Sequence, residues 1–223
     1  MGFMNNKRLL PLFGELDVAG VSERQELSRI GATRPPLDAQ TAQEFDVASE
    51  FIFNTLVPRP VVREVGGISF MTAMTWRAAV KDAQLKALRI LKRHLPDRFV
   101  AAAGLQVASV ARKFHGDRAF SVVVPVPCGH SGRPDCLSYR LAEVVSGALD
   151  SAFVPALEPH LVRGSSHPKQ SRNFRKPRVT TRLKGRVLVI DDVCTTGRHI
   201  SFSVAALRDA GADASGLVWI GSR

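Results

Sequence analysis

Two adjacent carboxylates, Asp191 and Asp192, stand between an apolar run and a hydroxyl-rich turn in the segment VLVIDDVCTTG, residues 187–197. The apolar run predicts a buried strand, and the Thr-Thr-Gly at residues 195–197 predicts the start of the next helix. Free backbone N–H groups at a helix start bind phosphate, and glycine lets the backbone approach it closely. Carboxylates beside such a site suit a ligand with both hydroxyl groups and a phosphate, as in ribose 5-phosphate.

Other classes of protein also end an apolar strand in two acids. A Walker B segment needs a partner phosphate loop, and the chain contains no G-x-x-x-x-G-K-[ST]. A receiver domain carries its acids near the start of its sheet, whereas only residues 193–223 follow the pair here. A buried strand that ends in a solvated acidic turn, without any ligand, is the remaining alternative.

The elements that must position this segment differ between the two parts of the chain. The N-terminal part predicts a hairpin at residues 61–71 around Gly66-Gly67 and helices at residues 38–56, 75–95 and 97–115. The second part predicts helices at 137–150 and 199–211, and strands at 120–127, 152–157, 186–193 and 215–221. This order predicts an α/β fold, with a parallel sheet flanked by helices after a mostly helical N-terminal part.

Composition limits the classes of function. The chain has 223 residues, 45% of them hydrophobic, which suffices for one α/β domain with an elaboration. The cysteines, at 128, 136 and 194, form neither a disulfide framework nor a C-x-x-C pair, so we expect reduced thiols and a cytoplasmic location. No window predicts a signal peptide or a membrane span. The net charge of +11 predicts a surface that attracts polyanions.

Residues 187–197 resemble the signature with which type I phosphoribosyltransferases bind 5-phosphoribosyl 1-diphosphate (PRPP): apolar residues, two acids, two variable positions and Thr-Thr-Gly. VVVPVP and the loop after it are similar to that family's first core strand and pyrophosphate loop, and the C-terminal LVWIGSR resembles the ComF-like branch. The resemblance implies a type I phosphoribosyltransferase-like sheet. It divides the chain into an N-terminal arm with a helical hood segment, residues 1–71, and an α/β core with its leading helices, residues 72–223.

The resemblance also implies roles for individual residues. Asp191 and Asp192 would hydrogen-bond the ribose hydroxyls, and the turn would surround the 5-phosphate. The ribose-phosphate site would comprise Asp191, Asp192, Val193, Cys194, Thr195, Thr196, Gly197, Arg198 and His199. Mg²⁺ would arrive with PRPP, and one of the two acids would assist it directly or through water. No covalent nucleophile is needed, so Cys194 is not expected to act as one.

Two further loops would complete the site by resemblance. The pyrophosphate loop would present Cys128, Gly129, His130 and Arg133, and an ordinary surface loop is the alternative for it. A basic flexible loop would close over the site and present Lys169, Arg172 and Arg175, with Lys169 and Arg172 counted beside the two acids as catalytic. A solvated basic loop is the alternative there.

The chain departs from the family pattern at three places. Arg198-His199 replaces the small pair that often follows Thr-Thr-Gly, although an imidazole also donates a hydrogen bond to phosphate. Thr195 stands where purine-salvage enzymes carry an acid, which weakens the interpretation as hypoxanthine or guanine salvage. The cysteine-rich zinc element common in ComF-like proteins is absent.

Two hypotheses for function therefore stand side by side. In the first, a magnesium-requiring enzyme transfers the 5-phosphoribosyl group of PRPP to an unidentified nitrogenous base and releases pyrophosphate. In the second, a non-catalytic protein senses PRPP or a nucleotide, or binds nucleic acid through the basic helix within 75–95 and the loop 163–186. The alternative for that helix is ordinary packing, with a leucine stripe that faces the core and basic residues that face solvent. The chain also has few aromatic residues that could stack on bases. A second copy of the chain, bound through residues 1–37 as a homodimer, is a further candidate partner.

Overall fold

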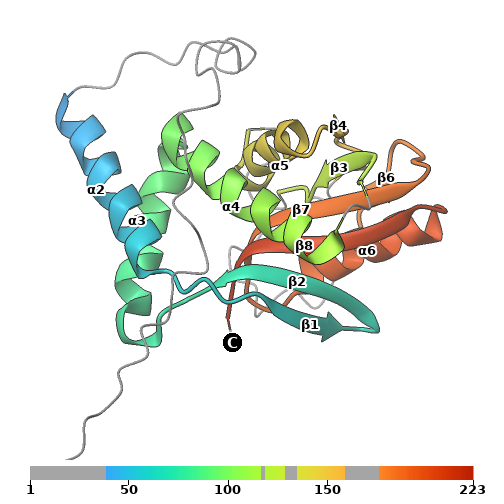
Figure 1. Ribbon diagram of the computed structural model, residues 1–223, viewed down its shortest axis with the longest axis horizontal. Coiled ribbons are helices and arrows are strands. Elements are labelled where there is room, and N and C mark those ends of the chain that lie inside the picture. Colours follow the sequence, from blue (N-terminus) through green and yellow to red (C-terminus); the bar gives the residue numbers. More distant parts are fainter. Residues whose placement is uncertain (1–38, 117–118, 129–134, 159–175, 223) are drawn as a thin grey trace, which may run out of the picture. The chain divides into compact units, whose positions relative to one another are not determined.

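The computed structural model describes residues 39–116, 119–128, 135–158 and 176–222 (Figure 1). The chain divides into two units, residues 1–38 and 39–223, and the described residues all belong to the second. Within this part, no helix is long and apolar enough to cross a membrane.

The centre of the described unit is a six-stranded mixed sheet in the order β1-β2-β8-β7-β3-β4. Five strands are parallel to their neighbours, and only the edge strand β1 runs antiparallel, to β2. The strands are β1 (Val61–Val65), β2 (Ile68–Thr75), β3 (Val122–Pro125), β4 (Ala152–Phe153), β7 (Arg186–Cys194) and β8 (Asp213–Gly221). The prediction of a mostly parallel sheet in an α/β fold is confirmed.

Within the described residues, five α-helices accompany the sheet, and all of them were predicted. They are α2 (Ala39–Thr55), α3 (Lys81–His94), α4 (Asp97–His115), α5 (Leu137–Ala148) and α6 (Arg198–Asp209). The helix predicted for 75–95 begins later because Thr75 still belongs to β2 and a short 3₁₀ turn, Ala78–Val80, precedes Lys81. At its end, Leu95 adopts a left-handed conformation, with φ of 47°, and closes α3 through a bond from its N–H to the carbonyl of Leu91.

The single strand predicted for 152–157 is wrong. The segment divides into β4, which pairs with β3, and β5 (Leu157–Glu158), which pairs with β6 (Arg178–Val179) in a separate two-stranded sheet. Pro155 lies between β4 and β5 and has no N–H to continue a ladder.

Two hydrophobic clusters cover the two faces of the sheet. On one face Leu188 and Ile190 of β7 pack with α2, α3, α4 and α5, and on the other Val187 and Val189 pack with α6. Figure 1 shows α4 and α5 on one side of the strands and α6 on the other. Because successive side chains of a strand point to opposite faces, an unbroken apolar run is what a strand buried on both faces requires.

The first hairpin is part of the main sheet. Strand β2 pairs with β8 from Phe70 to Thr75, so it runs across the position between residues 71 and 72 where the sequence suggested a boundary. The helix α2 is held to the same unit by an aromatic cluster of Phe53, Phe99 and Trp219, with ring centroids 5.5–6.3 Å apart. The division into a hood and a core stays a prediction.

Candidate functional site

The two carboxylates lie inside strand β7 (Arg186–Cys194), in agreement with the strand predicted for 186–193. Pairing with β8 continues along β7 as far as Cys194, which lies opposite Gly221. On the other side, the ladder with β3 ends where Pro125 meets Ile190, the residue before the acids. Asp191 and Asp192 therefore occupy a stretch of β7 that, among the described residues, has a strand partner on one side only.

Asp191 is the buried member of the pair, with 7% of its surface exposed. Burial, and then the negative charge of Asp192, raise its pKa from an ordinary value near 3.8 to about 8. One of its oxygens, Oδ1, accepts a hydrogen bond from the backbone N–H of Asp192 at 2.9 Å. The Asp191 carboxyl can therefore hold a proton near neutral pH.

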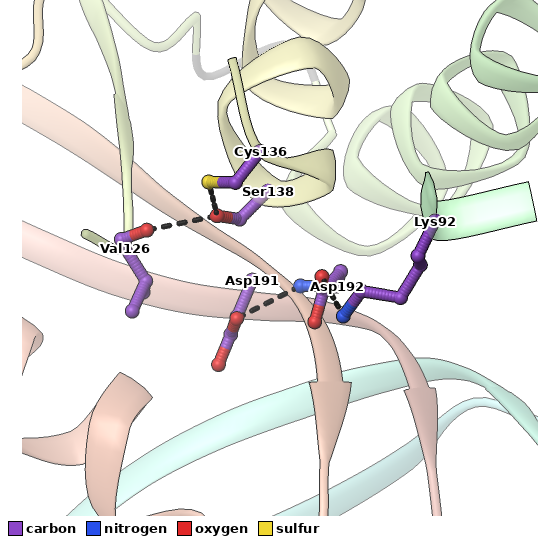
Figure 2. A network of polar contacts seen from close by, with 6 residues as sticks. All are labelled: Lys92, Val126, Cys136, Ser138, Asp191 and Asp192. Atoms are coloured by element: carbon purple, nitrogen blue, oxygen red, sulfur yellow. Dashed lines mark hydrogen bonds and ion pairs between the residues drawn. The ribbon is translucent and has the colours of Figure 1, made fainter. Parts of the chain in front are cut away.

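Asp192 is paired with a lysine that sequence reasoning missed. The ammonium of Lys92, from the last turn of α3, lies 2.6 Å from Oδ2 of Asp192 (Figure 2). Burial alone would lower the pKa of Lys92, but the charges of Asp192 and Asp191 and the hydrogen bond to Asp192 outweigh it, and the pKa is raised. The sequence assigned the basic residues of this helix to a solvated face or a nucleic-acid surface.

The hydroxyl-rich turn follows directly. Thr195 and Thr196 are exposed, whereas Gly197 is buried and caps α6 with a φ of 79°. A Cβ at Gly197 would lie 2.6 Å from the Phe70 ring, so both its backbone conformation and its packing require glycine. The backbone N–H of Arg198 points to Oγ1 of Thr196 at 3.4 Å. The first turn of α6 thus begins beside two exposed hydroxyl groups.

A second cation reaches this segment from the hairpin. Arg63 of β1 donates to Sγ of Cys194 at 3.0 Å and to the carbonyl of Thr195 at 3.4 Å. Burial raises the pKa of the Cys194 thiol, although Arg63 opposes that shift. A buried, protonated thiol is a poor nucleophile. Of the remaining members of the predicted ribose-phosphate site, Val193 is half-buried within β7. Arg198 and His199 lie in the first turn of α6 and are exposed and half-buried, respectively.

The predicted pyrophosphate loop lies mostly outside the described residues, which include Cys128 but not Gly129, His130 or Arg133. Its two ends are anchored close to the acids. The N–H of Val126 donates to the carbonyl of Ile190 at 2.8 Å, and Ser138 Oγ at the start of α5 donates to the carbonyl of Val126 at 2.9 Å (Figure 2). The pKa of the Cys136 thiol is raised, first by its hydrogen bond with Cys128 and then by burial.

Three residues of the predicted flexible loop, Lys169, Arg172 and Arg175, also lie outside the described residues. The described ends of that segment are β5 and β6, which pair with each other. Whether these side chains approach the acid pair stays a prediction.

The donor set allows a simple test of whether a magnesium ion suits the site. Within the described ranges, no three His, Cys, Asp or Glu side chains are grouped closely enough to hold a metal by themselves. Asp191 and Asp192 are adjacent along β7, and each presents one carboxylate. Mg²⁺ is commonly bound by one or two carboxylates, with substrate phosphates and water as its other ligands. The residues therefore fit a metal that arrives with its substrate.

Comparisons with known proteins add little to this geometry. No family model matches the chain. A search of curated proteins finds no match either. Among solved structures, the chain is similar to the crystal structure of orotate phosphoribosyltransferase from Aeropyrum pernix, with a TM-score of 0.37 and 18% sequence identity. That likeness covers 78% of this chain and 80% of the other. The function is accordingly argued below from the residues of this chain.

Proposed function

We propose that this protein binds PRPP and transfers its 5-phosphoribosyl group to a nitrogenous base with release of pyrophosphate. The observation that carries the proposal is the acid pair in the one-sided stretch of β7, followed at once by an exposed Thr-Thr-Gly turn that starts α6. Carboxylates are acceptors for sugar hydroxyls, whereas a helix start with free N–H groups and hydroxyl side chains is a donor for phosphate. A bare phosphate would be repelled by the acids.

In this proposal the chain holds the sugar at both ends. Asp191 and Asp192 accept hydrogen bonds from the ribose 2- and 3-hydroxyls, and the turn with Thr195 and Thr196 donates to the 5-phosphate. Arg63, which already contacts the carbonyl of Thr195, adds positive charge beside the phosphate. The anomeric carbon is then fixed while its bond to the pyrophosphate oxygen breaks and its bond to the base nitrogen forms.

The chemistry asked of the protein is mainly positioning and charge stabilisation. Displacement at an anomeric carbon passes through an oxocarbenium-like state, so a sugar held rigidly between two sets of hydrogen bonds lowers the entropic part of the barrier. Mg²⁺, when bound with PRPP, would neutralise charge on the leaving pyrophosphate. Asp191 and Asp192 are the residues that would contact it, directly or through water. No covalent intermediate is required, in keeping with the buried thiol of Cys194.

The finer assignments belong to the same proposal. The C-terminal LVWIGSR supports a relationship to ComF-like proteins. Thr195, at the position where purine-salvage enzymes carry an acid, supports an acceptor other than hypoxanthine or guanine. A protein that binds PRPP as a signal, without transfer, shares every contact named above. It differs only in releasing no pyrophosphate.

Calorimetric titration of PRPP, with and without Mg²⁺, into wild type and an Asp191→Asn/Asp192→Asn variant tests the proposal. We expect magnesium-dependent binding by the wild type and a loss of at least about a hundredfold in the variant, because it lacks both carboxyl groups that accept the ribose hydroxyls. Thermal melting of both proteins is the control for folding.

A folded wild type that does not bind PRPP would overturn the proposal and direct the search to nucleic acid at varied salt. Where PRPP binds, pyrophosphate release with a panel of nitrogenous bases then separates an enzyme from a sensor.

A further inference from the structure

Lys92 lies far from the signature segment in sequence, yet packing and hydrogen bonds fix the helix that carries it. The helix α3 that carries it is fixed by Gln84, which is fully buried and bonds Oγ1 of Thr55 at 3.0 Å and the N–H of Arg77 at 3.1 Å. The neighbouring Leu91 is also fully buried in the larger hydrophobic cluster. The core therefore holds the backbone of Lys92 beside the acid pair.

The side chain of Lys92 is more exposed than the carboxylate that it contacts. It is 40% exposed, whereas that of Asp192 is 14% exposed. A lysine is a compact charge on a flexible four-carbon stem with three donors, so its ammonium can change partner without disturbing the helix. The ion pair with Asp192 joins a fixed carboxylate to an adjustable cation.

This ion pair competes with the ligand of the proposed function. In the structure, Oδ2 of Asp192 accepts its hydrogen bond from Lys92 (Figure 2). A ribose hydroxyl that binds there has to share or replace that donor. A ligand with a diphosphate next to the ribose would bring new anionic oxygens close to the same ammonium, and these would compensate the loss of the ion pair.

Building on the proposed function, we propose that Lys92 is a further ligand-binding residue, whose ammonium neutralises Asp192 in the ligand-free protein and passes to the diphosphate of PRPP on binding. In the exchange, ribose hydroxyls replace the ammonium as donors to Asp192 while the ammonium gains the diphosphate, so neither charged group is left without a partner. It also gives the protein a means to distinguish PRPP from a sugar phosphate without a diphosphate, because only PRPP offers the ammonium a new partner.

Titration of two ligands into matched lysine variants tests the exchange. Lys92→Met removes the ammonium but keeps an unbranched stem, and Lys86→Met removes an exposed lysine of the same helix as the control. We expect Lys92→Met to weaken PRPP binding about tenfold to a hundredfold, the effect of one hydrogen bond between charged groups. Ribose 5-phosphate should bind Lys92→Met as tightly as the wild type or more tightly, and Lys86→Met should behave as the wild type with both ligands.

Other outcomes would overturn the exchange. Equal weakening of PRPP and ribose 5-phosphate would mean that Lys92 only maintains the shape of the site. Stronger binding of both would mean that it only blocks Asp192. Equal PRPP affinities for Lys92→Met and Lys86→Met would remove Lys92 from the site and leave the proposed function intact, whereas a wild type that binds neither ligand would remove both proposals. Should Lys92→Met fail to fold, Lys92→Gln offers the same comparison with a polar side chain.

Discussion

The acid pair and the hydroxyl turn are separated by only two residues, yet their surroundings differ sharply. Asp191 is 7% exposed and Asp192 is bonded to Lys92, whereas Thr195 and Thr196 are exposed. Gly197, which ends the turn, is buried again against Phe70. The contrast teaches that one short motif combines positions fixed by packing with positions that face solvent.

The physical consequence is a separation of stability from binding. A buried carboxylate is costly unless it is protonated or paired, and the structure uses both solutions, a raised pKa at Asp191 and a salt bridge at Asp192. An exposed hydroxyl carries no such cost. The loss of stability on substitution should therefore follow how deeply each residue of the motif is buried. The proposed affinity for PRPP should change independently of that loss.

Gly197→Ala should cause the largest loss of stability. The new Cβ would meet the Phe70 ring in a backbone conformation that alanine rarely adopts, so we expect the free energy of unfolding to fall by about 3 kcal/mol. Gly67→Ala is the matched control, because its φ of 75° is similar but nothing lies within 4 Å of its Cβ, and about 1 kcal/mol is expected there. Urea denaturation measures both. Equal losses at the two glycines would show that the Phe70 contact contributes nothing.

The pH dependence of stability should come from the acid pair and not from the turn. The pKa of Asp191 in the folded protein is raised to about 8, so the native state binds a proton that the unfolded chain releases near pH 4. Stability should therefore fall as pH rises between about 4 and 8, and Asp191→Asn should remove that fall. In this window the free energy of unfolding of the variant, relative to that of the wild type, should rise by about 1 kcal/mol per pH unit. Urea denaturation at several pH values gives the free energy of unfolding of both proteins. The prediction is wrong if the values for wild type and variant change in parallel with pH.

Thr196→Ala should have the smallest effect on stability. The side chain is exposed, and its contact with the N–H of Arg198 is long at 3.4 Å, so the free energy of unfolding should change by less than about 0.5 kcal/mol. Its PRPP affinity should nevertheless fall about tenfold, because one hydrogen bond to phosphate is lost. Calorimetry and thermal melting of the same preparation report both quantities. A destabilised variant would place Thr196 with the core instead of the ligand.

Much of the fold was predictable because its signals are local. The apolar run of β7, the periodicity of α4 and the glycine pair of the first hairpin each lie within a few residues. The weak segment 152–157 was misread because two short strands separated by Pro155 look like one interrupted strand.

The sequence by itself determined the mostly parallel α/β architecture and the adjacency of two acids to a hydroxyl turn. Only the tertiary structure decided that β7 pairs with β8 but, in the described residues, no longer with β3 at the two acids, and that Lys92 and Arg63 are the cations that meet this segment. Those two contacts join residues 100 and 131 positions apart. Hydrophobic periodicity specifies which face of an element is buried, but it does not specify which distant charge will lie opposite a given carboxylate, because that depends on how the packed elements meet.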